Sequence, residues 1–270
     1  MKLIVEPGRR AKNYWHDLWQ YRELMYFLAW RDITVRYKQT VIGIAWAVLR
    51  PGLTMLAFLG FRRLAGLPPG QIPDAILVSA AVLPWQFFST ALTDTAGSVI
   101  GNSHLISKVY FPRLIVPCSA IASALVDFLI TLCLLIILML AYGLVPRWQM
   151  VGLPLFLILA VGLSLGLGLL FAALNVEYRD VRYIVPFCVQ FGMFLSPIAF
   201  SSSEIPDKWR LLYSLNPMVA VIDGFRWSVS GGATSLDLIT VSPAVLITVI
   251  LILIGITYFR RVERSFADVI

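Results

Sequence analysis

The stretch from Arg31 to Pro51, "RDITVRYKQTVIGIAWAVLRP", decides the fold class of this chain. Its first half is basic, with Arg31, Arg36 and Lys38, and its second half carries almost no charge until Arg50. No polar linker separates the two halves. A basic segment that runs directly into an apolar one is typical of the cytosolic approach to a transmembrane helix, because Lys and Arg are retained on the cytosolic side.

The whole chain has the composition of a membrane protein. Of its 270 residues, 59% are hydrophobic and 14% are charged, whereas a soluble domain is about 45–50% apolar and about 25% charged. The apolar residues form continuous runs of about 20, the length that a helix needs to cross the hydrocarbon core. We therefore predict an all-α polytopic membrane protein with six transmembrane helices, at residues 41–61, 75–98, 113–142, 151–174, 183–200 and 240–259.

The distribution of Lys and Arg indicates the orientation of these spans. Eight of them precede the first span, and the loops and tail on the same side of the membrane add Lys108, Arg113, Arg179, Arg182, Arg260, Arg261 and Arg264. The loops on the other side hold only six. This excess predicts that both termini are cytosolic. The net charge of +7 is then a signature of topology and gives no reason to expect a nucleic-acid partner.

Residues 13–30, "NYWHDLWQYRELMYFLAW", have the pattern of an amphipathic helix. An apolar face recurs at helical spacing in Tyr14, Leu18, Tyr21, Met25 and Leu28. Trp15, Trp19 and Trp30 favour a helix that lies in the membrane interface, although packing on a protein partner would give the same pattern. The expected organisation is a cytosolic segment with this helix at 1–40, a transmembrane domain at 41–260 and a cytosolic tail at 261–270, with no cleavable signal peptide.

Motifs for chemistry are sparse in this sequence. "GLSLG" at Gly162–Gly166 matches the G-x-S-x-G of hydrolases, but it lies inside an apolar run rather than between a strand and a helix. With Gly168 it repeats the small-residue spacing of close helix packing, which we prefer. The two histidines, His16 and His104, form no metal-ligand set with the cysteines, so no metal site is predicted. The cysteines lie in apolar runs and are interpreted as packing residues (Cys118, Cys133 and Cys188).

The chain also lacks the sequence of a P-loop. That motif needs Lys followed by Ser or Thr, and none of the five lysines has such a neighbour. Asp127 is the only acidic residue well inside a span, with Asp94 nearer an end, and no internal repeat is visible, which disfavours an ion-coupled carrier. We expect a chain that is not itself an enzyme and that depends on a separate ATPase.

Most of the chain resembles the permease subunits of bacterial ABC-2-type polysaccharide exporters, the O-antigen export group in particular. Besides the opening stretch, the resemblance lies in "LPWQFFSTAL" at 83–92, "GNSHLISKVYFPRLIVP" at 101–117, "ALVDFLI" at 124–130, "NVEYRDVRYIVPF" at 175–187, "LSPIAFSSSEIPDKWRLLYSLNPM" at 195–218 and "IDGFRW" at 222–227. The chain departs from the family pattern at Arg50 and at the pair Arg62–Arg63. We expect Arg50, half a span deep, to face protein or water rather than lipid.

The resemblance implies a homodimer of permeases in the bacterial inner membrane, with two nucleotide-binding ATPase subunits below it. ATP and Mg would bind those subunits, and the cargo would be a lipid-linked polysaccharide. A permease for capsule or teichoic acid is the alternative within this class. Two other classes stay open, a membrane-embedded glycosyltransferase and a passive scaffold. The glycosyltransferase would need an acidic pair, and the available pairs lie in small loops with basic neighbours (Glu177 with Asp180, Glu204 with Asp207).

Three groups of candidate site residues follow. The loop at 100–113 is cytosolic by charge, and the resemblance implies a short helix there that couples to the ATPase through Leu105, Ile106, Lys108, Val109 and Tyr110. Short re-entrant helices between the fifth and sixth spans would gate the outer exit, with Trp209, Asn216, Pro217 and Arg226 as candidates.

The third group is aromatic, since aromatic faces suit a sliding sugar chain. A helical stripe in the fifth span can line the conduit or pack against neighbours, and the conduit candidates are Phe187, Phe191 and Phe194 there with Trp46, Trp85, Phe87 and Phe88 in the first two spans.

Overall fold

The computed structural model describes residues 14–38, 45–66, 72–263 and 266. The regular elements in these ranges are all helices, so the predicted all-α class is confirmed for the described part of the chain. They are α1 (Tyr14–Gln20), α2 (Arg22–Lys38), α3 (Ala45–Leu64), α4 (Asp74–Gly101), α5 (Ser103–Lys108), α6 (Ile115–Ala141), α7 (Leu153–Glu177), α8 (Val181–Phe194), α9 (Asp207–Ser214), α10 (Pro217–Val229) and α11 (Leu238–Val262), with short 3-10 turns η1 (Trp148–Gly152) and η2 (Ser202–Glu204).

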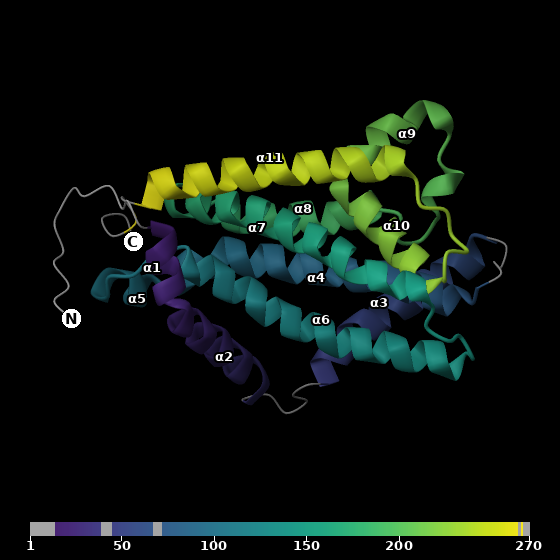
Figure 1. Ribbon diagram of the computed structural model, residues 1–270, viewed down its shortest axis with the longest axis horizontal. Coiled ribbons are helices and arrows are strands. Elements are labelled where there is room, and N and C mark those ends of the chain that lie inside the picture. Colours follow the sequence, from purple (N-terminus) through teal and green to yellow (C-terminus); the bar gives the residue numbers. More distant parts are fainter. Residues whose placement is uncertain (1–13, 39–44, 67–71, 264–265, 267–270) are drawn as a thin grey trace.

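Four long helices form the body of the molecule and run side by side along its length (Figure 1). α4 is the central one, packed between α6 and α7, and α11 covers the far side of α7. In the described ranges these four, counting η1 with α7, are the helices long and apolar enough to cross a membrane. α1, α5 and the end of α11 gather at one end of the bundle, whereas α9 and the start of α4 lie at the other (Figure 1).

Small residues let α7 and α11 approach closely. A Cβ built on Gly166 would lie 2.7 Å from the backbone nitrogen of Ile252, and one on Gly255 would lie 2.3 Å from the carbonyl oxygen of Gly166. Side chains longer than hydrogen cannot be accommodated at such distances without separating the helices. The prediction that the Gly162–Gly168 stretch serves helix packing is therefore confirmed.

Each predicted span overlaps a helix, although residues 41–44 of the first lie outside the described residues, and the first and fifth differ from the rest. α3 contains three arginines, and none of its residues is buried against the other helices. α8 covers only Val181–Phe194 of the predicted 183–200, so the fifth span is shorter than predicted. The helix stops there because Pro197 disfavours the helical conformation of Ser196 and cannot donate a backbone hydrogen bond.

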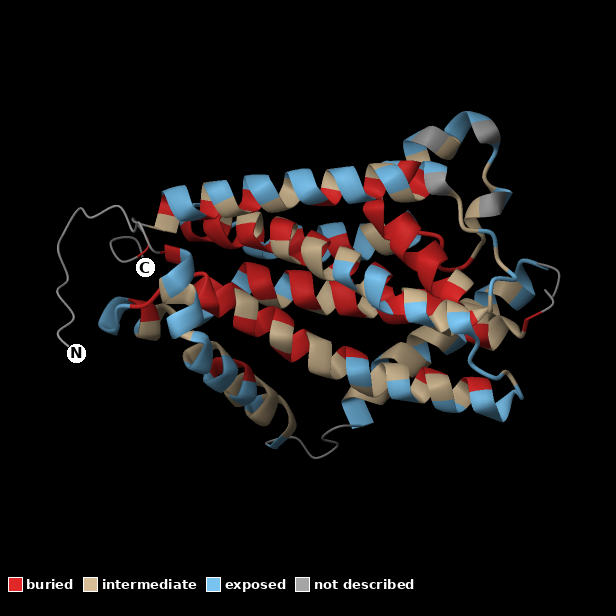
Figure 2. Cartoon of the chain, in the orientation of Figure 1, coloured by how far each residue is buried: buried red, intermediate tan, exposed pale blue. Residues whose placement is uncertain are grey.

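The predicted amphipathic helix at 13–30 is two helices that meet at Tyr21 and extend to Lys38. The expected apolar face does turn inward, since Tyr14 and Leu28 are buried in one cluster with the ends of α6, α7 and α11. The opposite face carries exposed tryptophans, among them Trp19, which is 68% exposed. Figure 2 shows this division, with buried residues of α1 and α2 toward the bundle and exposed ones away from it.

Candidate functional site

A cluster of charges holds α2 against the bundle. The Arg36 guanidinium on α2 lies between two carboxylates of the long helices: Nη2 donates to Asp94 Oδ2 of α4 at 2.7 Å, and Nη1 donates to Asp127 Oδ2 of α6. The Tyr37 hydroxyl donates to the other oxygen of Asp127. Burial, with the hydrogen bond to this carboxylate, raises the pKa of the Tyr37 hydroxyl. The cluster satisfies two acidic groups that would otherwise be costly in a membrane span.

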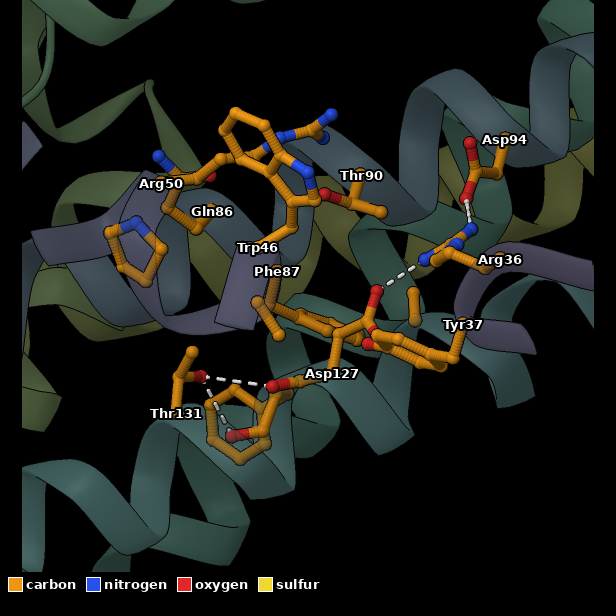
Figure 3. A pocket seen from close by; sticks show the side chains of 14 residues that line it. Arg36, Tyr37, Trp46, Arg50, Gln86, Phe87, Thr90, Asp94, Asp127 and Thr131 are labelled. Atoms are coloured by element: carbon orange, nitrogen blue, oxygen red, sulfur yellow. Dashed lines mark hydrogen bonds and ion pairs between the residues drawn. The ribbon is translucent and has the colours of Figure 1, made fainter. Parts of the chain in front are cut away.

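A cavity of about 460 Å³ opens beside this cluster, between α2, α3, α4 and α6 (Figure 3). Its lining mixes charges, neutral polar groups and aromatic rings, which include Arg50, Trp46, Gln86, Thr90 and Thr131. Trp46 is 44% exposed, and an aromatic face beside hydrogen-bonding side chains is suited to a sugar ring. Arg50 lines the cavity, in agreement with the expectation that it faces protein or water.

Sequence reasoning did not find this cluster. It noted Asp94 and Asp127 only as evidence against an ion-coupled carrier, and it treated Arg36 as part of the positive-inside signal. A usable signal was present, because an acidic residue inside a span requires a partner and the nearest basic residues are on the amphipathic segment. The choice of Arg36 over Arg31 depends on the orientation of α2, since Arg31 donates instead to Asn102 Oδ1 at 2.7 Å.

The predicted conduit residues fall into two groups. Phe187, Phe191 and Phe194 lie on the exposed face of α8, between 58% and 70% exposed, while every fourth residue of the opposite face is buried (Val181, Val185 and Val189). The aromatic candidates on α4 are buried instead, with Phe87 edge-on to Phe128 of α6. Trp85 and Phe88 pack on each other at 5.5 Å between ring centroids. Trp46 and the α8 rings are thus the exposed members of this set, whereas Phe87 lines the cavity beside Arg36 and Trp85 and Phe88 line a separate apolar cavity next to α8.

The predicted coupling segment forms the short helix α5 and the turn after it. Ile106 is buried against the rest of the chain, and Leu105 packs on the same cluster. Lys108, Val109 and Tyr110 are exposed at the end of the molecule. The segment is thus anchored by its first apolar residues and presents the following ones outward.

Two arginines fix the turn between α8 and α9, at the end of the bundle where α4 begins. Arg226 of α10 is 6% exposed, and its guanidinium donates to the carbonyl oxygens of Ile198 at 2.9 Å and Phe200 at 2.8 Å. Arg62 of α3 donates to the carbonyl oxygen of Ala199 at 2.9 Å and to Asp74 Oδ1 at 3.0 Å. These bonds hold the turn that follows α8, whose backbone groups have no helical partners.

The other predicted gate residues lie near this turn. Asn216 caps α10, because its Oδ1 accepts from the backbone N–H of Met218 at 3.1 Å and its Nδ2 donates to Ser196 Oγ at 3.2 Å. Pro217 is buried at the first position of α10, as capping geometry favours. Trp209 is 53% exposed and lines an apolar cavity of about 640 Å³ between α8, α9 and the bundle.

Comparison with known proteins gives a consistent result. The chain is 27% identical to an O-antigen export system permease protein of Klebsiella pneumoniae over 92% of this chain and 95% of the relative. It is 30% identical to an O-antigen export system permease protein of Myxococcus xanthus over 78% of this chain and 81% of the relative. A polysialic acid transport protein of Escherichia coli is 25% identical over 87% of this chain and 92% of its own length.

The family comparison covers the site described above. The model of the ABC-2 type transporter family matches residues 23–230, from the start of α2 through the end of α10. This range includes the charge cluster at Arg36, the coupling segment, the aromatic face of α8 and the outer arginines. The chain belongs to the ABC-2 type transporter family.

Proposed function

We propose that this chain is the transmembrane subunit of an ATP-driven exporter that moves a lipid-linked polysaccharide across the bacterial inner membrane. The observation that carries the proposal is the match, over most of the chain, to relatives named for O-antigen export and for polysialic acid transport. Both cargoes are long carbohydrates. The O-antigen type is preferred because those relatives share more identical residues, and a capsule polymer is the second candidate.

The topology that fits this role has six spans. α4, α6, α7 and α11 supply four of them. α3 would be the first span, with Arg50 toward the inner cavity and Arg62 at the outer end. α8 has 14 residues, which at about 1.5 Å per residue is too short to cross about 30 Å of hydrocarbon. Its crossing would be completed by the turn after Phe194, with α9 and α10 as re-entrant helices on the outer side.

The cytosolic side carries the partner surfaces in this proposal. The amphipathic segment within residues 1–40 lies along the inner face, residues 41–260 form the transmembrane domain, and the tail at 261–270 is cytosolic. Two permeases pair around a conduit, and two ATPase subunits, which bind ATP and Mg, dock on the exposed Lys108, Val109 and Tyr110. Six helices enclose too little space for a hydrated polymer, and a twofold pair provides it between the protomers.

The cargo would meet the cavity beside Arg36 first. Trp46 offers an aromatic face there, and Gln86, Thr90 and Arg50 offer hydrogen-bond donors and acceptors at the cytosolic end of the bundle. The exposed rings of α8 then provide stacking surface without fixed charge, so a polymer can slide without being trapped. Polar and aromatic groups therefore follow one another along a path from the inner face toward the outer helices.

Reconstitution tests the proposal. The permease and its ATPase, in proteoliposomes, are expected to move lipid-linked O-polysaccharide to the far leaflet only when ATP is supplied. The Tyr110→Asp variant should insert normally and fail to co-purify with the ATPase, whereas the control Tyr178→Asp, in the other cytosolic loop and 61% exposed, should keep it. Preference for a capsule-type polymer would select the second candidate, and glycosyl transfer without transport would overturn the class.

A further inference from the structure

One carboxylate joins both ends of the described chain to the coupling segment. Glu263, directly after α11, accepts the backbone N–H of Arg113 at Oε1 over 3.0 Å. The Tyr14 hydroxyl, at the start of α1, donates to both carboxylate oxygens, at 3.3 and 3.2 Å. Arg113 closes the segment that begins with α5. A single side chain at the end of α11 therefore bonds to two other segments that are far apart in the sequence, and so joins three segments.

Cations and rings surround this junction. The Arg260 guanidinium lies 4.6 Å from the centre of the Tyr14 ring, and the Arg113 guanidinium lies 5.7 Å from that of Phe266. Phe266 is fully buried and meets Phe259 edge-on at 5.3 Å. Contacts of these kinds add to the hydrogen bonds, because cations favour the faces of aromatic rings and rings favour edge-to-face pairs.

The junction is sheltered from water. Burial raises the pKa of the Glu263 carboxyl, against the opposing effect of the hydrogen bonds from Arg113 and Tyr14. Burial, together with the Glu263 carboxylate, also raises the pKa of the Tyr14 hydroxyl. Hydrogen bonds in such a place are stronger than at the surface, and an unpaired group there is more costly. A shortened side chain at position 263 would therefore loosen all three segments.

A cavity lies beside the junction, so few other contacts join the two sides there. About 450 Å³ of space lies between the outward half of the coupling segment and the helices behind it, lined on one side by Lys108, Val109 and Tyr110 and on the other by Tyr14 and Glu263. Across this space the bonds of Glu263 form a direct bridge. The coupling segment is thus held by buried Ile106 near its start, by buried Phe111, and by the bond from Glu263 at its end.

We propose that Glu263 is a positioning residue for coupling: it fixes the coupling segment to α1 and to the end of α11, so that a displacement of α5 moves both helices together. This inference rests on the proposed function, since it assumes that an ATPase pushes on α5. It assigns to the C-terminal end of α11 a part in transmission, besides its part in the bundle.

Hydrogen–deuterium exchange on the assembled permease–ATPase complex tests the bridge without measuring transport. Glu263→Ala removes the acceptors, so amides in residues 103–114 and in α1 should exchange about fivefold faster, as expected when about two buried hydrogen bonds are lost. Glu263→Gln keeps an acceptor for Arg113 and a donor for Tyr14, and should stay within about twofold of wild type. Fast exchange in the Gln variant, or unchanged exchange in the Ala variant, overturns the bridge.

A matched control separates this junction from a general loss of packing. Glu177 also accepts a tyrosine hydroxyl, that of Tyr258 at 3.0 Å, and it links α7 to α11 without touching the coupling segment. Glu177→Ala should leave exchange in residues 103–114 unchanged. If it accelerates that exchange as Glu263→Ala does, the effect is not specific to the junction and the proposal fails.

Transport then tests the consequence. With Glu263→Ala, co-purification and ATP hydrolysis should persist, while polysaccharide exported per ATP hydrolysed falls about fivefold, in proportion to the weakened bridge. Glu263→Gln should restore the ratio. If Glu263→Ala does not fold, Tyr14→Phe, which removes one of the two donors, serves in its place with a smaller fall. An unchanged ratio overturns the positioning role. If the wild-type complex exports nothing, the proposed function fails. The exchange experiment then still tests the Glu263 bridge, because it does not depend on transport.

Discussion

Arg36 and Arg50 line the same cavity but have different surroundings. Arg36 is paired with Asp94 and Asp127, whereas no ion pair of Arg50 occurs among the described residues. The first arginine therefore neutralises two acidic groups and fastens α2. The second has a guanidinium left for a ligand. We expect substitutions at the two positions to separate stability from transport.

Arg36→Met should lower the free energy of unfolding by about 2 kcal/mol, because it removes the cationic partner of two carboxylates, while the Tyr37 hydroxyl still donates to Asp127 and the partial exposure of both side chains, 35% for Asp94 and 23% for Asp127, tempers the cost. Changing Asp94 and Asp127 to Asn as well should recover part of that loss. Arg50→Met should keep stability within about 0.5 kcal/mol and reduce export. Denaturation in detergent and the reconstituted assay measure the two effects. Equal destabilisation by Arg36→Met and Arg50→Met would contradict the distinction.

Arg62 and Arg63 form a second informative pair at the outer side. Arg62 holds the turn after α8 and the Asp74 carboxylate, while Arg63 is exposed. Arg62→Met should cost about 1–3 kcal/mol of unfolding free energy, because a carbonyl and a carboxylate lose their donor, whereas Arg63→Met should cost less than about 0.5 kcal/mol. Thermal denaturation of the two variants compares them directly. A larger loss for Arg63→Met would rule out the role given to Arg62.

Much of the cluster chemistry could not be predicted from sequence because it depends on pairing between distant elements. The departure at Arg62 was visible, but its partners Asp74 and Ala199 are fixed only when α3, α4 and the turn after α8 come together. By contrast, the position of Arg50 was predictable from its depth in a span, since a guanidinium there must avoid lipid.

Among the elements, the apolar runs located the helices well, and local chemistry decided where they end. The pair Ser196–Pro197 ends α8 at Phe194, whereas the apolar run predicted a span to residue 200. The face that each helix buries was harder to predict. α8 has one buried stripe and one exposed stripe, so its rings could be placed on one side. α4 is surrounded by α3, α6, α7, α8 and α10, and for such a helix the spacing of Trp85, Phe87 and Phe88 gives no exposed side.

The exposed stripe of α8 carries the next prediction. Phe191→Ala should reduce export of long chains by about two- to tenfold, the range expected when one aromatic contact of about 0.5–1.5 kcal/mol is lost. Phe191→Leu should do the same, because it keeps bulk and loses the ring face. Neither should change stability or ATPase assembly, since the side chain is 58% exposed. Chain-length profiles of the exported polymer are the measurement.

A buried residue of the same helix provides the control. Val185→Ala, on the opposite face and 2% exposed, should lower stability by about 1–2 kcal/mol through the cavity it leaves. Its export per folded molecule should be unchanged. If both Phe191 variants export chains of normal length and amount, the rings of α8 serve packing rather than the conduit.

At the scale of the whole molecule, the exposed rings of α8 require a second surface. A protein face with Phe187, Phe191 and Phe194 side by side can meet lipid, yet only a facing copy of the same chain would convert it into an enclosed path. Closed twofold pairing places identical surfaces opposite one another. The proposed homodimer therefore predicts that α8 of one protomer lies near α8 of its partner.

Cross-linking in membranes tests that arrangement. In a chain whose three native cysteines are replaced by alanine, Phe187→Cys should form a covalent dimer with a short bis-maleimide, because a residue on α8 lies opposite its own copy across the twofold axis. Leu246→Cys on α11 is the matched control: its side chain is equally exposed, at 61% for both residues, but it lies on α11 rather than on α8 and should remain monomeric. Efficient cross-linking through Leu246→Cys alone would put α11 at the interface, and the α8 rings would then face lipid. Addition of lipid-linked polysaccharide should slow the Phe187→Cys reaction, because a polymer within the path would separate the two thiols.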